Sequence, residues 1–278
     1  MRGLRVAFVV QGEGRGHMTQ ALALAPMLRA AGHEVVRVMI GRSAHRPVPP
    51  YFSEGIGAPV IPFEAPVQVP DEDRRGVSVA RTLGDAVRRS PRFFQSAVKI
   101  AEHVEDADVV VNLLDLMAGV SRRLFHSRTP AVAIAHNYLF LHRELADAPG
   151  PARHRSAILA YARATATRTS RKIALAFTPL EPDAGHDLDI APPLLRPGLD
   201  RLEIRDGGYL LAYALNSGYG ASLIEWQRRS RVEVHCFVEG GASALPEAAQ
   251  GFHAHDLDAA KFLEQDRKST RLNSSHQI

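Results

Sequence analysis

A loop near the amino terminus brings three glycines next to a histidine. Residues 12–20 read Gly-Glu-Gly-Arg-Gly-His-Met-Thr-Gln, with the histidine at position 17. Glycine has no Cβ, so such a loop can turn sharply and let a ligand approach the backbone. A helix that begins near His17 would direct free amide groups and the positive end of its dipole toward the loop. The loop is therefore expected to bind a polar or anionic group. The alternative is a structural turn that holds no ligand.

A dinucleotide is one candidate ligand for this loop. The glycine spacing is G-x-G-x-G-H, however, and lacks the third glycine of the G-x-G-x-x-G fingerprint. The next strand is expected to end at Gly41 and Arg42, where an NAD-binding site would place an acid. An arginine there can instead bind the 2′-phosphate of NADP. An NADP-dependent oxidoreductase is thus one alternative function.

The elements that must position the loop follow from the pattern of apolar residues. Apolar runs alternate with helical spacing from residue 4 to residue 177. The first two strands are apolar at successive positions, as in strands that are covered by helices on both faces. The pattern predicts an α/β fold with a doubly wound parallel sheet. The expected strands are 4–10, 34–40, 109–112, 131–135 and 173–177, and the expected helices are 18–31, 80–89, 93–105, 117–125 and 153–170.

A second α/β unit is expected after a connector rich in proline and glycine, at residues 192–198. The length of 278 residues predicts about two domains. We place them at residues 1–203 and 204–266. The second contains expected strands at 209–215 and 232–238, a helix at 221–229 and the start of another at 258–265. So short a unit makes a poor core by itself, so the second domain is expected to be incomplete.

The last twelve residues, 267–278, differ from the rest of the chain. They read RKSTRLNSSHQI, show no helical or strand period, and resemble translated sequencing-adaptor read-through. We expect a non-native tail; a natural disordered terminus is the alternative. The tail holds three basic residues and no acid, and the whole chain has a formal charge of +4, so the remainder is close to neutral. Nucleic acid is therefore not an expected partner.

Composition and apolar run length exclude several classes of protein. The 45% hydrophobic and 23% charged residues exclude a disordered, collagen-like or coiled-coil chain. Apolar runs are far shorter than a membrane span, and no signal peptide is evident, so a cytoplasmic protein is expected. The arginines at 74, 75, 81, 88, 89 and 92 precede Phe93 and Phe94. They form either a solvated face or a peripheral contact with anionic lipid.

Metal and disulfide chemistry are not expected from the sequence. The single cysteine, Cys236, excludes an intrachain disulfide and a thiolate-cluster metal site. His253 and His255 have no third partner in the sequence near them, so no metal site is expected.

Two blocks of sequence carry a resemblance to a known family. The expected first strand followed by GEGRGHMTQALALAPMLRAAGHEV resembles the opening of the B-type nucleotide-sugar glycosyltransferases. It is similar to the start of bacterial N-acetylglucosaminyltransferases that act on lipid intermediates, and of UDP-glycosyltransferases. Residues 108–118 and 130–136 resemble the acidic strand end and the next parallel strand of the same group. The resemblance covers about residues 4–265. It implies two Rossmann-like domains and an inverting transfer of a sugar from a nucleoside-diphosphate sugar to a hydroxyl.

For such a transfer, His17 is the expected general base. A neutral imidazole with a pKa of about 6.5 can accept the hydroxyl proton at neutral pH. The helix dipole would disfavour the imidazolium. The resemblance implies that a carboxylate braces this histidine, and Asp115 matches that place. Asp115 is equally expected to cap the helix that follows it, and one residue can do both.

Ligands of open parallel sheets bind beyond the carboxyl ends of the strands. The expected acceptor-side residues are Gly14, Arg15, Gly16, Thr19, Asn112, His136 and Asn137. A purely structural role is the alternative for His136. The shape of the acceptor pocket would depend on loops such as Pro47–Asp73.

The resemblance implies that Asn216, Ser217 and Gly218 contact the donor phosphates; an ordinary turn is the alternative. The expected partners are a nucleotide-sugar donor and a small-molecule or lipid-linked acceptor, without a metal or another cofactor. The rest of the donor site is expected beyond Gln265, so this chain is expected to be a fragment with little activity. A non-catalytic α/β binding module is a further alternative.

Overall fold

The computed structural model describes residues 2–42, 48–67, 69, 71–72, 78–145, 152–195, 207–214, 217–247, 250–257, 261–262 and 265. The chain divides into two compact units. The first consists of Met1–Val67 and Leu83–Pro197, and the second of Gln68–Thr82 and Gly198–Ile278.

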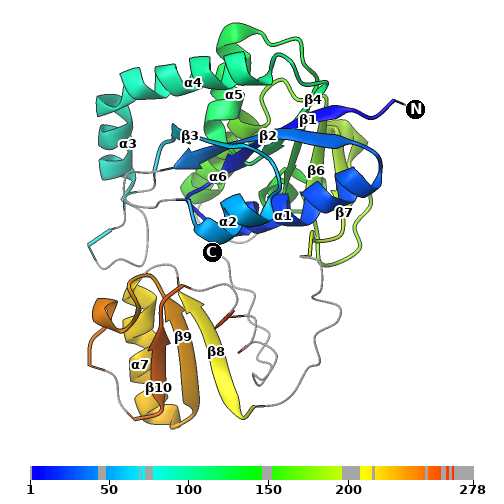
Figure 1. Ribbon diagram of the computed structural model, residues 1–278. Helices are drawn as coiled ribbons and strands as arrows, with labels where there is room; N and C mark the ends of the chain where they lie inside the picture. Colours follow the sequence, from blue (N-terminus) through cyan, green and yellow to red (C-terminus); the bar gives the residue numbers. More distant parts are fainter. Residues whose placement is uncertain are drawn as a thin grey trace. The chain divides into compact units, whose positions relative to one another are not determined.

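The first unit contains a seven-stranded parallel sheet with the order β3-β2-β1-β4-β5-β6-β7 (Figure 1). Every pair of neighbouring strands in it is parallel. The strands are β1 (Arg5–Gln11), β2 (Glu34–Arg42), β3 (Val60–Glu64), β4 (Val109–Leu113), β5 (Ala131–Ala135), β6 (Arg171–Leu175) and β7 (Leu188–Ala191). The doubly wound parallel sheet predicted from the sequence is thus confirmed.

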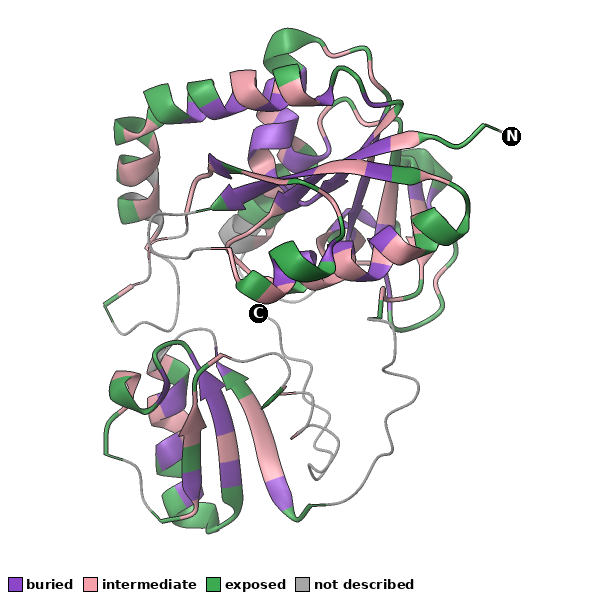
Figure 2. Ribbon diagram, in the orientation of Figure 1, coloured by how far each residue is buried: buried purple, intermediate pink, exposed green. Residues whose placement is uncertain are grey.

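Helices cover both faces of this sheet, because alternate side chains of the central strands point to opposite faces. Val6, Phe8 and Val10 of β1 pack with α1 (Arg15–Ala30) and α2 (Pro50–Gly55) on one face. Ala7 and Val9 pack with α4 (Ser90–Val104) and α5 (Leu116–Phe125) on the other. Figure 2 shows the buried residues concentrated along the central strands and on the helix sides that face them. The remaining helical elements of the first unit are α6 (Ala152–Thr165), η1 (His136–Leu141), η2 (Arg143–Leu145) and η3 (Ala184–His186). The helix α3 (Val79–Arg88) begins in the segment 68–82, which belongs to the second unit, and ends in the first.

The strand order reverses between β1 and β4. The chain leaves β1 toward β2 and β3 on one side and returns through β4 toward β7 on the other. In open parallel sheets, this reversal opens a crevice at the carboxyl ends of the two strands. The glycine loop follows β1, and Asp115 follows β4. The fold therefore brings these two segments to the same edge of the sheet.

The structure adds elements that the sequence pattern did not predict. The stretch 47–73, treated as a loop, contains α2 and β3. Pro62 lies within β3, and proline argues against a central strand. It is accommodated because β3 is an edge strand. The strand β7 and the helix η1 were also missed, and α6 ends at Thr165 instead of residue 170.

The second unit contains a three-stranded parallel sheet with the order β10-β9-β8 (Figure 1). Its strands are β8 (Tyr209–Ala214), β9 (Glu233–Val238) and β10 (Phe252–His255), and its helical elements are α7 (Ser217–Ser230) and η5 (Gly241–Ala244). The sequence did not predict β10, which is only four residues long. Ile224 of α7 packs in one core cluster with Val234, Cys236 and Phe252. The helix therefore covers one face of this small sheet.

Candidate functional site

A pocket opens at the strand-order reversal of the first unit. It is small, with a volume of about 30 Å³, and is open to solvent. Its walls come from the carboxyl ends of β1, β2 and β3, from the start of α5, and from α6. The lining residues are Gln11, Gly12, Glu13, Gly41, Arg42, Ala65, Pro66, Val67, Asp115, Leu116 and Tyr161. The position agrees with the rule that ligands of such sheets bind beyond the strand ends.

The three glycines of the loop have different surroundings in the structure. A Cβ on Gly12 would lie 2.0 Å from the carbonyl oxygen of Gly41, so only glycine fits against the end of β2. Gly14 is the N-cap of α1 in an extended conformation, and its amide donates to Gln11 Oε1 at 3.3 Å. Gly16 has no heavy atom within 4 Å of a built Cβ. Packing within the fold therefore explains Gly12 but leaves open space beside Gly16.

His17 lies in the first turn of α1 and is only 7% exposed. Its Nδ1 is 3.1 Å from Oε1 of Gln20, one turn later in the same helix. Burial lowers the pKa of His17 to about 4, and the charge of His136 acts in the same direction, while the hydrogen bond with Gln20 opposes both. The imidazole is therefore neutral at neutral pH. This neutrality was expected from the helix dipole, whereas burial is its main cause in the structure.

His136 stands beside His17, although it comes from a different part of the chain. It is the first residue of η1, directly after β5. The two rings are nearly parallel, with an interplanar angle of 5° and centroids 5.6 Å apart. Nε2 of Gln20 lies 3.5 Å from Nδ1 of His136. Burial also lowers the pKa of His136. Two neutral imidazoles are thus linked through one amide side chain.

The amide of Gln20 determines which nitrogen of each ring carries the proton. An amide offers an oxygen acceptor at one end and an NH2 donor at the other. Its oxygen faces Nδ1 of His17, so this nitrogen carries the proton and Nε2 keeps its lone pair. Its NH2 faces His136, so the proton of that ring lies on Nε2. From the sequence, Gln20 was expected only to be part of the loop; its spacing of three residues from His17 was the available signal.

Asp115 is the N-cap of α5 and is 1% exposed. Its carboxylate accepts a hydrogen bond from the amide of Ala118 at 3.0 Å. Burial raises the pKa of Asp115 to about 7, although hydrogen bonds from the amides of Ala118 and Met117 oppose the shift. In the part of the chain that the structure describes, His17 is bonded to Gln20 and not to Asp115. The capping role is therefore seen, and the bracing role stays a prediction.

The backbone turns sharply just before this carboxylate. Leu114 has a φ of 59°, in the left-handed region that a leucine rarely adopts. Strained residues of this kind often occur at functional sites. The turn places Oδ2 of Asp115 beside β2, where it lies 2.7 Å from the position of a Cβ built on Gly41. Asp115 thus reaches the pocket from β4 while it caps α5.

Asn112 was expected beside the acceptor, but its side chain supports the turn. It is fully buried. Its Oδ1 accepts from the Asp115 amide at 2.9 Å, and its Nδ2 donates to the carbonyls of Asp115 at 3.1 Å and Thr165 at 2.7 Å. All its polar groups are therefore used within the fold.

The other expected acceptor-side residues differ in their surroundings. Asn137 is half-buried, and within the described part of the chain its Oδ1 has no hydrogen-bond partner. Thr19 donates its hydroxyl proton to the carbonyl of Arg15 at 3.0 Å. The guanidinium of Arg15 lies 5.9 Å from the centre of the Tyr51 ring. Asn137 is thus the member of this group with an unused acceptor atom.

The expected donor-side residues fall at the start of α7. Asn216 and the side chain of Ser217 lie outside the described residues. Gly218 is half-buried in the first turn of the helix. Contact of these residues with a donor phosphate stays a prediction.

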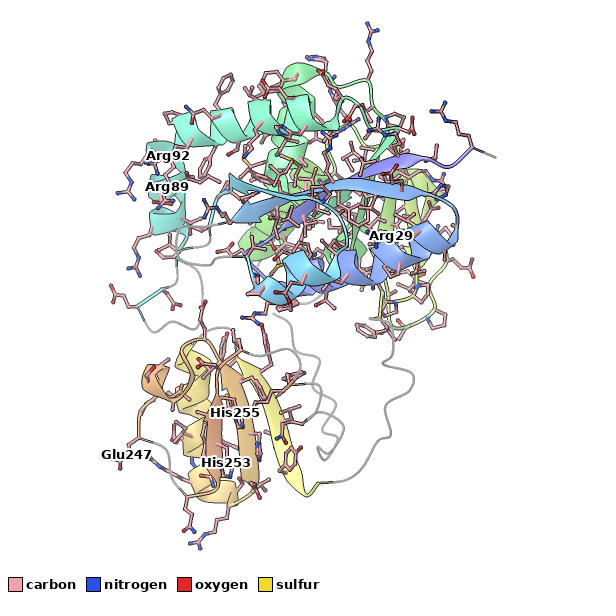
Figure 3. The ribbon with its side chains drawn as sticks, viewed as in Figure 1. Arg29, Arg89, Arg92, Glu247, His253 and His255 are labelled. Atoms are coloured by element: carbon pink, nitrogen blue, oxygen red, sulfur yellow. The ribbon has the colours of Figure 1, made fainter. Side chains whose placement is uncertain are left out.

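Two residues of the arginine-rich segment, Arg89 and Arg92, contact acidic residues of the first unit. Arg89 contacts Glu64 at 2.9 Å and Asp85 at 3.2 Å, and Arg92 lies 3.6 Å from Glu64 (Figure 3). Phe94 is exposed, whereas Phe93 is buried. Arg74 and Arg75 lie outside the described residues. Lipid contact at this segment stays a prediction. The described helices include none whose length and apolar character would allow it to span a bilayer.

Comparison with known proteins bears on the fold. No protein-family model matches the sequence, and no curated protein matches it. Solved structures do resemble the chain. Arabidopsis thaliana UGT89C1 complexed with UDP-L-rhamnose has a TM-score of 0.56 and 12% identity, and the match covers 97% of this chain and 74% of that chain.

Two further structures show the same likeness. A Listeria monocytogenes protein named as a UDP-N-acetylglucosamine 2-epimerase has a TM-score of 0.54 and 12% identity, with 94% of this chain and 71% of that chain covered. LpCGTa in complex with UDP has a TM-score of 0.50 and 15% identity, with 84% of this chain and 66% of that chain covered. At such identities the likeness shows the fold. The chain therefore has the fold of the B-type glycosyltransferases, with a doubly wound parallel-sheet domain that carries the glycine loop and a second parallel α/β unit.

Proposed function

We propose that the protein is an inverting glycosyltransferase that moves a sugar from a nucleoside-diphosphate sugar to the hydroxyl of a small-molecule or lipid-linked acceptor. The observation that carries the proposal is the state of His17. Its imidazole is neutral, its Nδ1 is bonded to Gln20, and it lies in the first turn of the helix that follows the glycine loop. The proposal assigns the acceptor proton to the lone pair on Nε2; the ring is 7% exposed, and His17 is not among the residues that line the pocket.

In the proposed reaction, the acceptor hydroxyl passes its proton to Nε2 of His17 as its oxygen attacks the anomeric carbon. The bond between that carbon and the diphosphate breaks, and the diphosphate leaves with the electron pair. A single displacement inverts the anomeric configuration. The negative charge that develops on the diphosphate favours the imidazolium, so the pKa of His17 rises as the proton arrives. In this proposal, the N–H group at Nε2 of His136 donates a hydrogen bond to the acceptor.

The fold alone does not choose this reaction, because one fold hosts many chemistries. The Listeria protein named as an epimerase shares the fold with UGT89C1, for which a complex with quercetin is also known. UDP or a UDP-sugar is bound in UGT89C1 and in LpCGTa. These neighbours support a nucleotide-sugar donor here. The pair of histidines supports a transfer to a hydroxyl.

Transfer can be tested on the purified protein. It is incubated with a panel of nucleoside-diphosphate sugars and hydroxyl acceptors, and product is detected by mass spectrometry and by release of nucleoside diphosphate. We expect a glycoside whose anomeric configuration, read by NMR, is opposite to that of the donor. A product with retained configuration would exclude the single displacement, and the absence of transfer across the panel would contradict the proposal.

The alternative as an NADP-dependent enzyme has one residue in its favour, since Arg42 lines the pocket. A fluorescence titration with NADPH separates the two functions. We expect no saturable binding of NADPH. Tight binding that is lost in Arg42→Ala would support the oxidoreductase instead.

A further inference from the structure

Three histidines and a glutamate gather on one face of the second unit's sheet. Glu233 and His235 lie two residues apart on β9. His253 and His255, labelled in Figure 3, lie two residues apart on β10. The strands are parallel, and His235 is the register partner of His253. Because side chains two residues apart share a face, all four project from the same side. The opposite side holds the core residues that pack with α7.

The donor atoms of three of these residues have the spacing of a metal site. Oε1 of Glu233 lies 3.2 Å from Nε2 of His235 and 3.3 Å from Nε2 of His253, and all three atoms lie within 4.8 Å of one another. A tetrahedral zinc ion with ligand bonds of about 2.0–2.1 Å separates neighbouring ligand atoms by about 3.3 Å. The glutamate already stands at that separation from both histidines.

The fourth residue supports this arrangement. A histidine that binds metal through one ring nitrogen normally hydrogen-bonds through the other, which fixes its orientation. His235 does this: its Nδ1 lies 2.9 Å from Nε2 of His255. The ring of Tyr209 also packs against His235, with the two ring centres 4.5 Å apart. His235 is therefore held in place while its Nε2 points to the glutamate.

Ions can reach the cluster from solvent. The side chain of His235 is 15% exposed, whereas those of His253 and Glu233 are 48% and 50% exposed. Neutral imidazole and carboxylate are the forms that bind a divalent ion.

We propose that Glu233, His235 and His253 bind one Zn²⁺ ion, with His255 as the positioning residue for His235. The ion would join β9 to β10 and keep one coordination position for water or another ligand. Two imidazoles and a carboxylate suit zinc and the similar ion Co²⁺ better than Mg²⁺ or Ca²⁺. The site lies within the second unit and is independent of the proposed transfer. The sequence did not reveal it because the ligands come from two strands that meet only in the folded sheet.

Cobalt spectroscopy on the full chain, purified without a histidine tag, tests the proposal. We expect one equivalent of Co²⁺ to give the intense visible absorption of a four- or five-coordinate site, and one equivalent of Zn²⁺ to remove it. A weak spectrum typical of six-coordinate Co²⁺, or no saturation near one equivalent, would overturn the proposal. The cobalt titration uses the wild-type protein, so its outcome does not depend on whether a variant folds.

Substitutions then assign the ligands by competition with a chromogenic chelator. We expect Glu233→Gln and His253→Ala each to weaken Zn²⁺ binding by at least about 100-fold, and His255→Ala by about 10- to 100-fold. His126→Asn, which changes an exposed histidine of the first unit, is the matched control and should bind like the wild type. Far-UV circular dichroism without metal verifies that each variant is folded. Folded ligand variants with wild-type affinity would show that the cluster is only hydrogen-bonded and would overturn the proposal.

Discussion

At the scale of single residues, Gln20 influences how His17 can act, because it bonds to Nδ1 of the imidazole. An isolated neutral imidazole divides its proton between two nitrogens, whereas the amide of Gln20 holds it on Nδ1. The same amide places the proton of His136 on Nε2. One side chain therefore prepares a base and a donor that stand 5.6 Å apart, measured between ring centres.

Gln20→Leu should lower turnover without removing the base. We expect a loss of about tenfold, smaller than the loss on removal of the imidazole, because part of the His17 population would hold its lone pair on the wrong nitrogen. Nitrogen NMR of the histidine side chains reports the tautomer directly. Gln20→Glu also offers an acceptor to Nδ1 and should restore the tautomer. A Gln20→Leu protein with wild-type turnover and an unchanged tautomer would refute this role.

Asp115 should make stability depend on pH. Its ordinary pKa is 3.8 and burial raises it to about 7, so between these values the folded state binds more protons than the unfolded state. The free energy of unfolding contributed by this group therefore falls as pH rises through that range. Asparagine can also cap a helix but does not ionise.

Asp115→Asn should consequently gain stability relative to the wild type as pH rises. We expect little difference at about pH 4 and a growing advantage toward about pH 8, at most about 4 kcal/mol. Urea unfolding of both proteins at several pH values measures this difference in the free energy of unfolding. A difference that is constant with pH would show that the carboxyl titrates in its ordinary range.

At the scale of elements, the junction between β1 and α1 depends on Gly12. A side chain at this position would collide with the carbonyl oxygen of Gly41 and with Ile40. Gly16, four residues later, faces open space. The two glycines are therefore a matched pair, one required by packing and one not.

Gly12→Ala should destabilise the protein by about 3 kcal/mol, because β1 and β2 must separate locally to admit the methyl group. Gly16→Ala should raise stability by about 0.5–1 kcal/mol, since alanine is the better helix former. Chemical unfolding of both variants and of the wild type measures these changes in the free energy of unfolding. Equal effects of the two substitutions would contradict the close approach of Gly12 to Gly41.

The same elements show what the sequence could predict. The order β1, α1, β2 followed from uninterrupted apolar runs and helical spacing, which are local signals. The edge strand β3 was missed because Pro62 interrupts its pattern, and β10 because it is too short. Contacts between distant segments had no local signal. The pairing of His17 with His136, 119 positions apart, and of Glu233 with His253 depends on how the strands assemble.

Asn112 illustrates a related limit. Its place at the end of a buried strand predicted contact with an acceptor. In the structure, its amide holds the carbonyl of Thr165 at the end of α6 and closes the turn around Asp115. A polar residue at a strand end can serve the site or the fold, and the sequence does not distinguish the two.

At the scale of the whole molecule, the two units differ in the cores that they build. The described residues of the first unit form three hydrophobic clusters on the two faces of a seven-stranded sheet. Those of the second form one cluster between a three-stranded sheet and α7. Less buried apolar surface gives less stability.

The second unit should therefore unfold at a lower urea concentration than the first. The single tryptophan of the chain, Trp226, lies in α7 and reports on this unit alone. Far-UV circular dichroism reports mainly on the first unit, which holds most of the helices and strands. We expect the fluorescence midpoint to precede the dichroism midpoint. Coincident midpoints would show that the two units unfold together.

The most direct test of the proposed chemistry is the turnover of His17→Ala with the donor and acceptor that the panel identifies. We expect turnover to fall by about 100-fold or more, with an unchanged circular dichroism spectrum, because the group that accepts the proton is gone. His126→Asn, a change at an exposed histidine, should retain wild-type turnover. A folded His17→Ala protein that transfers sugar at the wild-type rate would contradict the role of His17 as the general base.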